Sequence, residues 1–243
     1  MIRKFATFCA LALFVLATAS CQKLAARDSL NKGIKAFKEG NFPRAAEYFD
    51  QASKQDPELT NAQLYLATAY ASQFVPGVPG EENEAYAGNA IKTFESVLAK
   101  DPKNVSAVSG LAGLYQGLKN FDKSREYYKL QTEIDPTNAV PYYAIASTNW
   151  LVIRDRATRG EPMSDEEKAY IVEEGLQYVD KALERDPNYQ EAMAYKNLLL
   201  RDKAALAKDP AQAQALVDEA NVWFEKALAT LKSNAEKKSS GSE

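Results

Sequence analysis

The sequence predicts an all-α protein built as a stack of helical hairpins, because its composition favours helices and one spacing recurs along it. Of the 243 residues, 46% are hydrophobic and 26% are charged, which is ordinary for a folded protein. Ala, Leu, Glu and Lys are abundant and β-branched runs are few, so helix is favoured over sheet. Asp-Pro pairs recur at Pro57, Pro102, Pro136 and Pro187, with separations of 45, 34 and 51 residues.

The first element in the chain has the pattern of an export signal. Arg3 and Lys4 precede an apolar run from Phe5 to about Ala17, and small residues follow it. The run is too short to span a bilayer comfortably, so a secretory signal peptide is predicted over residues 1–20.

The segment Thr18-Ala19-Ser20-Cys21 resembles the lipobox of bacterial lipoproteins, although Thr18 stands where Leu is commonest. The resemblance implies that Cys21 is acylated and that residues 21–25 link the lipid anchor to the folded part. Gln22 then implies sorting to the outer membrane, facing the periplasm. Ordinary cleavage after Ala19, which would leave a soluble protein with a free thiol, stays open as the alternative.

The composition excludes several kinds of functional site. The chain has no His and only two Cys, Cys9 and Cys21, so imidazole-dependent nucleophiles, disulfide frameworks and the usual zinc sites lose their residues. We therefore expect no catalytic, metal or cofactor site. The net charge is −3, which argues against a nucleic-acid partner. Basic and acidic residues alternate, so no basic patch for a lipid surface is expected either.

A small–aromatic–small pattern stands twelve, eight and five residues before each of these prolines. The matching residues are Ala45, Phe49 and Ala52; Ala90, Phe94 and Val97; Ser124, Tyr128 and Gln131; Gly175, Val179 and Ala182; and, in a copy without Pro, Ala220, Phe224 and Ala227. Leu66-Ala67 followed by Tyr70, and Leu111-Ala112 followed by Tyr115, supply the first half of the pattern.

Together these residues resemble the tetratricopeptide repeat, whose period is 34 residues. The resemblance implies a right-handed α-solenoid of about five helical hairpins over residues 26–232. The copies cover about residues 26–59, 60–104, 105–138, 139–189 and 190–232. A hairpin buries its apolar face only by stacking on its neighbours. We therefore expect the aromatic side chains of the pattern in the core, namely Phe49, Tyr70, Phe94, Tyr115, Tyr128 and Phe224.

Residues beyond the 34-residue period fall inside three hairpins, between the first and the second helix. They cover Phe74 to Asn83, about Arg154 to Asp165, and Asp202 to about Asp209. A capping box at Ser164 and an N-cap at Asp209 predict where the second helices of copies four and five begin. Whether the inserts have a function or are tolerated length variation stays open. Residues 233–243 are expected to form a disordered tail.

In the tetratricopeptide family, the first helices line a concave groove that binds a partner. The implied groove residues are Asn61, Tyr65, Thr68, Gln116, Tyr143, Ser147, Trp150 and Tyr195. Alternatively, Tyr143 and Trp150 pack beneath the insert of copy four. Leu30, Ile34 and Lys38 stand where chaperone-binding relatives hold a carboxylate, so that clamp is not reproduced.

The predicted function is that of a noncatalytic adaptor or assembly scaffold, which binds a protein or peptide in the bacterial cell envelope and is held at the membrane by its lipid. Two alternatives remain. One is an envelope hydrolase that works with paired carboxylates, for which Glu81, Glu82, Asp155, Glu161, Asp165 and Glu166 are the candidates. The other is a repeat protein that assembles with itself, and the oligomeric state is open.

Overall fold

The structure, a computed structural model, describes residues 21–240, and every secondary-structure element in this part is a helix. The expected signal peptide, residues 1–20, lies outside the described residues. The chain forms two compact units that divide between Leu118 and Lys119, and each is described by itself.

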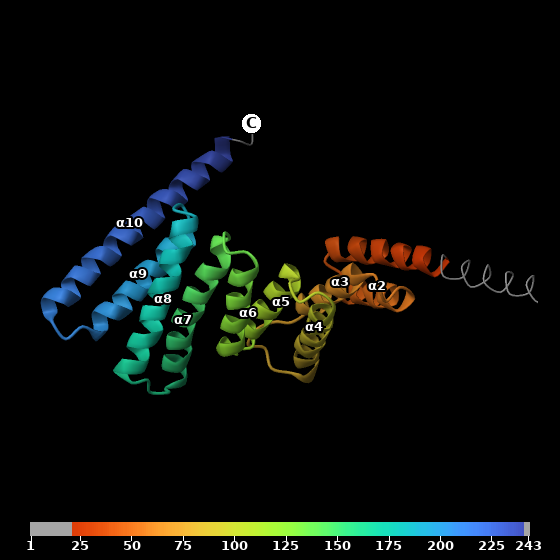
Figure 1. The fold of residues 1–243 in the computed structure, drawn as a ribbon, viewed down its shortest axis with the longest axis horizontal. Coiled ribbons are helices and arrows are strands. Elements are labelled where there is room, and N and C mark those ends of the chain that lie inside the picture. Colours follow the sequence, from red (N-terminus) through yellow and green to blue (C-terminus); the bar gives the residue numbers. More distant parts are fainter. Residues whose placement is uncertain (1–20, 241–243) are drawn as a thin grey trace, which may run out of the picture. The chain divides into compact units, whose positions relative to one another are not determined.

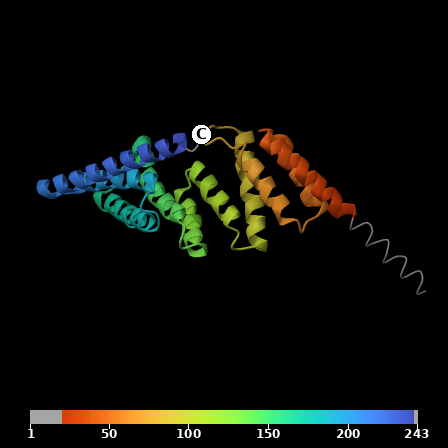
Figure 2. The ribbon, with the colours of Figure 1, turned by 90° about the horizontal axis from the view of Figure 1, so that it is seen from above.

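The first unit contains five helices. The first runs over residues 21–38 and is followed by α2 (Phe42–Gln55), α3 (Thr60–Ala71), α4 (Glu81–Lys100) and α5 (Val105–Gly117). From α2 to α5, each helix packs on the next, and α3 also contacts α5. The helix at residues 21–38 lies beside α2 (Figure 2), where the Ser29 hydroxyl donates to the side-chain oxygen of Gln55 at 3.0 Å.

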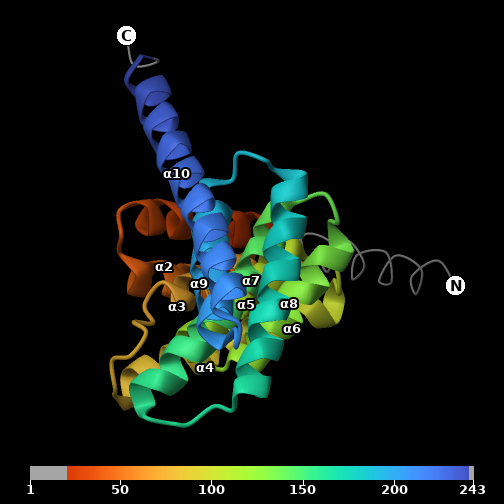
Figure 3. The ribbon, with the colours of Figure 1, turned by 90° about the vertical axis from the view of Figure 1, so that its left-hand side faces the viewer.

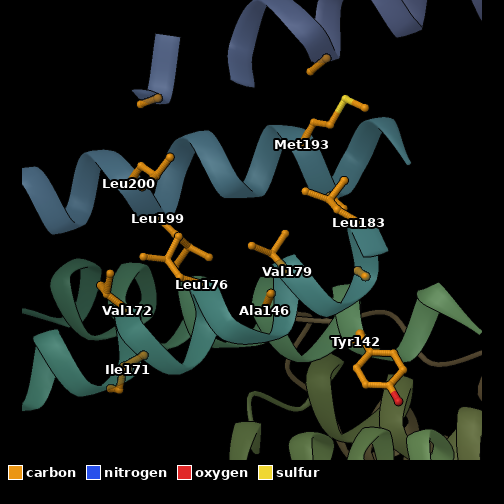
Figure 4. Packing of buried hydrophobic residues seen from close by; sticks show 14 of the residues in the cluster. Tyr142, Ala146, Ile171, Val172, Leu176, Val179, Leu183, Met193, Leu199 and Leu200 are labelled. Carbon is orange, nitrogen blue, oxygen red and sulfur yellow. The ribbon is translucent and has the colours of Figure 1, made fainter. Parts of the chain in front are cut away.

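The second unit contains α6 (Phe121–Ile134), α7 (Ala139–Arg159), α8 (Asp165–Arg185), α9 (Gln190–Leu206) and α10 (Pro210–Ser240). Again each helix packs on its successor (Figure 1). Apolar side chains between α7, α8 and α9 form the main core of this unit, with Val172, Val179 and Leu199 almost fully buried (Figure 4). Packing between sequence neighbours is how a repeat array builds its interior.

The Asp-Pro pairs end helices as expected, and the structure adds a role for the Asp. Asp56, Asp101, Asp135 and Asp186 are the C-cap residues of α2, α4, α6 and α8. Each carboxylate accepts a hydrogen bond from the backbone N–H two residues later, at 2.9 to 3.3 Å. This Asx turn starts the connection that the proline alone would only permit.

Glycine allows the closest helix contacts of the first unit. A Cβ atom on Gly110 of α5 would lie 2.4 Å from the ring of Phe94 on α4, and one on Gly33 would lie 2.5 Å from Phe49. Both rings are almost completely buried. The small and aromatic positions of the repeat are therefore direct packing partners.

Most of the expected core residues are confirmed, and one is wrong. Phe49, Phe94 and Tyr115 are buried, while Tyr70 and Tyr128 are half-buried. Phe224, however, is 44% exposed. It lies on α10, the last helix of the described residues, where no following hairpin covers the face that its counterparts bury.

The inserts differ from simple loops. Residues 72–80 do form a connection, which the Asn83 side chain closes through hydrogen bonds to Val75 and Val78. In copies four and five, the extra residues mainly lengthen the helices, leaving only residues 160–164 and 207–209 between them. The start signals are confirmed, because Ser164 accepts from the Glu167 N–H and Asp209 from the Ala211 N–H, each at 3.1 Å.

The expectation of a disordered tail is wrong for residues 233–240. Helix α10 continues to Ser240, and its last turns extend past the neighbouring helices (Figures 1 and 3). The sequence there contains Ala, Glu and Lys, which are strong helix formers, and a helix that is already nucleated needs little packing to propagate. Residues 241–243 lie outside the described residues.

Candidate functional site

The first unit contains a pocket of about 330 Å³. Its wall is mostly apolar and comes from the helix at residues 21–38 together with α2, α3 and α5. The lining residues are Ile34, Phe37, Lys38, Phe49, Leu64, Tyr65, Thr68 and Ser106. Two of the expected groove residues, Tyr65 and Thr68, are therefore brought together, as the position of first helices in the repeat implies.

Tyr65 presents the largest polar-tipped surface of this pocket. Its side chain is 39% exposed, and its ring centroid lies 5.4 Å from that of the buried Phe49. The Thr68 hydroxyl donates to the Leu64 carbonyl at 2.8 Å, so its oxygen can still accept a hydrogen bond. A Tyr held on a buried ring offers contact area at low entropic cost.

Lys38 is the charged member of the lining. It forms no ion pair within the part of the chain that the structure describes, and its side chain is exposed. An ammonium beside an apolar wall favours ligands that combine an apolar group with a negative charge. Sequence reasoning considered Ile34 and Lys38 only as a missing chaperone clamp, so their part in this pocket is new.

In the second unit, four aromatic side chains of α7, α9 and the residue before α9 form a row. The ring of Tyr143 lies 5.0 Å from Tyr189 and 5.5 Å from Tyr195, and Trp150 lies 5.6 Å from Tyr195, edge to face. Three of these four were expected in the groove. Tyr189 was missed, although its position just after an Asp-Pro pair is a signal for it.

The aromatic row is half-buried rather than open. Burial raises the pKa of Tyr143 to about 12, with Tyr195 and Tyr189 contributing, and burial likewise raises the pKa of Tyr189 to about 12. Both phenols therefore remain neutral donors at any physiological pH. The Trp150 indole N–H is buried and has no hydrogen-bond partner in the described residues.

The remaining expected groove residues contribute less. Ser147 is buried, and its hydroxyl donates to the Ala144 carbonyl at 3.0 Å. Asn61 is exposed and Gln116 is half-buried, and neither lines the pocket of the first unit. The expected groove thus separates into a pocket around Tyr65 in one unit and the aromatic row in the other.

A buried polar cluster between α6, α7 and α8 was not predicted. Asn149 is fully buried; its amide donates to Glu174 at 3.0 Å and accepts from Arg125 at 2.8 Å. Lys129 also donates to Glu174 at 2.8 Å. Burial opposes ionisation of Glu174, but the hydrogen bonds from Lys129 and Asn149 outweigh it and lower the pKa of this carboxyl.

The carboxylates offered for a hydrolase are arranged for structure. The hydrogen bond from Lys119 and the nearby Arg159 lower the pKa of Asp155, whereas a general acid needs a raised one. Glu161 pairs with Arg159 at 2.7 Å. In residues 21–240, no group of three or more acidic or Cys side chains is placed to hold a metal ion. Within the same residues, no helix has the length and apolarity needed to cross a membrane.

Two segments of the chain match models of the tetratricopeptide repeat, at residues 30–73 and 87–147. Among solved structures, MamA from Desulfovibrio magneticus RS-1, in a form that starts at residue 41, is 15% identical with a TM-score of 0.63, covering 86% of this chain and 96% of that one. Another MamA structure is 16% identical with a TM-score of 0.60, covering 87% and 94%. A comparison with curated proteins found no match.

At this level of identity, the structural likeness concerns the fold, and it confirms the predicted all-α repeat solenoid. The matched segments include the pocket-forming helices from Leu30 onward and the start of α7. The chain therefore contains tetratricopeptide repeats at residues 30–73 and 87–147, within a fold of stacked helical hairpins.

Proposed function

We propose that this protein is a noncatalytic scaffold of the bacterial cell envelope that binds a peptide segment of a partner protein in the pocket around Tyr65. The pocket carries the proposal, because an apolar wall with one free cation suits a segment that places an apolar side chain beside an acidic group. Its volume of about 330 Å³ suits side chains of a short segment rather than a folded domain.

Anchoring at the envelope is the second part of the proposal. Cys21 is exposed and is a free thiol at the start of the described residues, which leaves it open to acylation. Radiolabelled palmitate should therefore enter the full chain expressed in a two-membrane bacterium and should not enter its Cys21→Ser variant. Equal labelling of both forms, or labelling of neither, would overturn the lipoprotein assignment.

Selection from a random peptide library tests the pocket. Peptides that bind residues 21–243 should be enriched in a large apolar residue next to Asp or Glu. Leu64→Asp puts a charge into the pocket wall and should abolish binding, while circular dichroism checks that the variant remains helical. Lys38→Glu should shift the preference from acidic to basic peptides.

Lys35→Glu is the matched control, because Lys35 lies on the same helix and outside the lining of this pocket. It carries the same change of charge and should leave the preference acidic. If Lys35→Glu and Lys38→Glu change binding equally, the attraction is general and the pocket is not the site. Binding unaffected by Leu64→Asp would contradict the proposal directly.

Self-association is a second candidate, favoured by the exposed face of α10. Phe224, Leu228 and Leu231 lie one helical turn apart and are all exposed. Phe224 occupies the repeat position that earlier copies use to pack on the next hairpin, so a second copy of the chain could supply the missing neighbour. Light scattering over a concentration series should then detect a dimer that Phe224→Ser disrupts, and a monomer at all concentrations excludes it.

A further inference from the structure

The first described helix presents one strongly basic face. Residues 21–44 contain six basic and two acidic residues, whereas the chain as a whole has 30 basic and 33 acidic residues. The basic residues are Lys23, Arg27, Lys32, Lys35, Lys38 and Arg44. The expectation that no basic patch exists is therefore wrong locally, because averaging over the acidic remainder of the chain hid it.

The arrangement of this helix separates a packed side from a charged side. Ala26, Ser29, Gly33 and Ala36 are buried and follow the three- and four-residue spacing of one helical face. A second stripe with the same spacing is exposed on the opposite face; it consists of Leu24, Arg27, Asn31, Lys35 and Lys38. At 100° per residue, this stripe is centred on the side facing away from Gly33.

The charges of this face are available to a ligand. Lys32 pairs with Asp28 at 2.6 Å, but Lys23, Arg27 and Lys35 form no ion pair within residues 21–240. All three are exposed. Leu24 is an apolar side chain in the middle of these cations and is 72% exposed. Cations around a protruding apolar residue are the pattern of a helix that lies at a membrane surface.

We propose that the helix at residues 21–38 lies along an anionic bilayer surface, with its basic stripe against the lipid phosphates and Leu24 in the interfacial layer. The position of Cys21 at one end of the helix supports this partner, and this argument from position rests on the proposed anchoring. A lipid on Cys21 would hold the helix within reach of the bilayer. Electrostatic attraction then adds the second signal that stable attachment usually needs.

The physical range of the attraction fixes how the helix must lie. Seventeen steps separate residue 21 from residue 38, which is about 26 Å of helix. The Debye length at physiological ionic strength is about 8 Å. An upright helix would bring only its first turns within that range, so Lys35 contributes only if the helix lies parallel to the membrane.

Vesicle binding tests the proposal without the lipid anchor. We would use residues 21–243 with Cys21→Ser and measure co-sedimentation with phosphatidylcholine vesicles, with and without phosphatidylglycerol. Binding should require phosphatidylglycerol and weaken as salt is raised. The triple variant Lys23→Glu, Arg27→Glu, Lys35→Glu should bind at least about tenfold more weakly, since each cation near such a surface contributes severalfold to the partition coefficient.

A matched triple variant controls for net charge. Lys92, Lys103 and Lys232 are exposed and lie outside the basic face, so changing these three to Glu alters the total charge equally. This control should bind within about twofold of the parent, because distant charges are screened. Equal losses in both triple variants, equal binding to neutral vesicles, or binding insensitive to salt would each overturn the proposal.

The orientation has its own readout. A polarity-sensitive dye on Asn31→Cys, within the stripe, should shift to the blue when anionic vesicles are added. The same dye on Ala25→Cys, which is exposed on another side of the helix, should not shift. Shifts of equal size at both positions would contradict the parallel arrangement. None of these measurements uses a peptide partner or acylation, so they fail or succeed independently of the proposed function.

Discussion

Substitution of Gly110 by Ala tests the close contact on which the repeat packing depends. In an open helical position, this change stabilises a protein by about 0.5–1 kcal/mol, because glycine is a poor helix former. Here, the new Cβ atom would lie 2.4 and 2.6 Å from two ring carbons of Phe94. Overpacking of this kind costs about 1–3 kcal/mol. Because the ring is almost completely buried and has little room to move, we expect a net loss of about 1–2 kcal/mol.

The same helix contains a matched control. A Cβ atom on Gly113 of α5 would meet no other atom within 4 Å, so Gly113→Ala should gain about 0.5–1 kcal/mol. Urea unfolding followed by far-ultraviolet circular dichroism measures both changes. In a Gly110→Ala background, Phe94→Leu should cost less than it does in the parent, because the smaller side chain relieves the overlap. Equal stability of the two alanine variants would refute the packing argument.

Three further predictions concern the second unit and the core. Asn149→Ala should cost about 2–3 kcal/mol in urea unfolding, because Arg125 and Glu174 lose a buried partner; a loss below about 0.5 kcal/mol would contradict this. The lowered pKa of Glu174 means that its ionised form stabilises the fold at neutral pH, and this contribution should disappear as pH falls below its ordinary value of 4.5. Glu174→Gln should therefore flatten the fall of the melting temperature on acidification. Finally, Phe49→Ala should cost about 3–5 kcal/mol and Phe224→Ala less than about 1 kcal/mol, although both occupy the same repeat position.

The repeat pattern could be predicted because it reflects local packing rules. Small residues such as Gly110 and aromatic residues such as Phe94 stand at fixed distances from each Asp-Pro pair, and those distances set the helix ends. The same local logic failed at Phe224, because burial there depends on whether another hairpin follows. It also failed for the tail, where helix propensity decided the outcome and the Ser and Gly content was misleading.

The site was only partly predictable, for a related reason. Tyr65 and Thr68 follow from the position of first helices in the repeat, but the pocket also needs Phe37 and Lys38 from the preceding hairpin, and no spacing rule joins these pairs. Asn149 gave no signal at all, because a buried Asn is recognised only when its partners from other helices are known. Contacts between hairpins were therefore harder to foresee than the hairpins themselves.

The placement of tryptophan gives the chain a built-in optical reporter. Both tryptophans, Trp150 and Trp223, belong to the second unit, while the first unit contains only tyrosine among fluorescent side chains. Trp150 lies under the guanidinium of Arg154, 5.0 Å from its ring, so anything that disturbs this stack changes its emission. A ligand seated on the aromatic row should alter the spectrum, and one confined to the pocket around Tyr65 touches no indole. Selective excitation of tryptophan thus distinguishes occupation of the two surfaces without any added label.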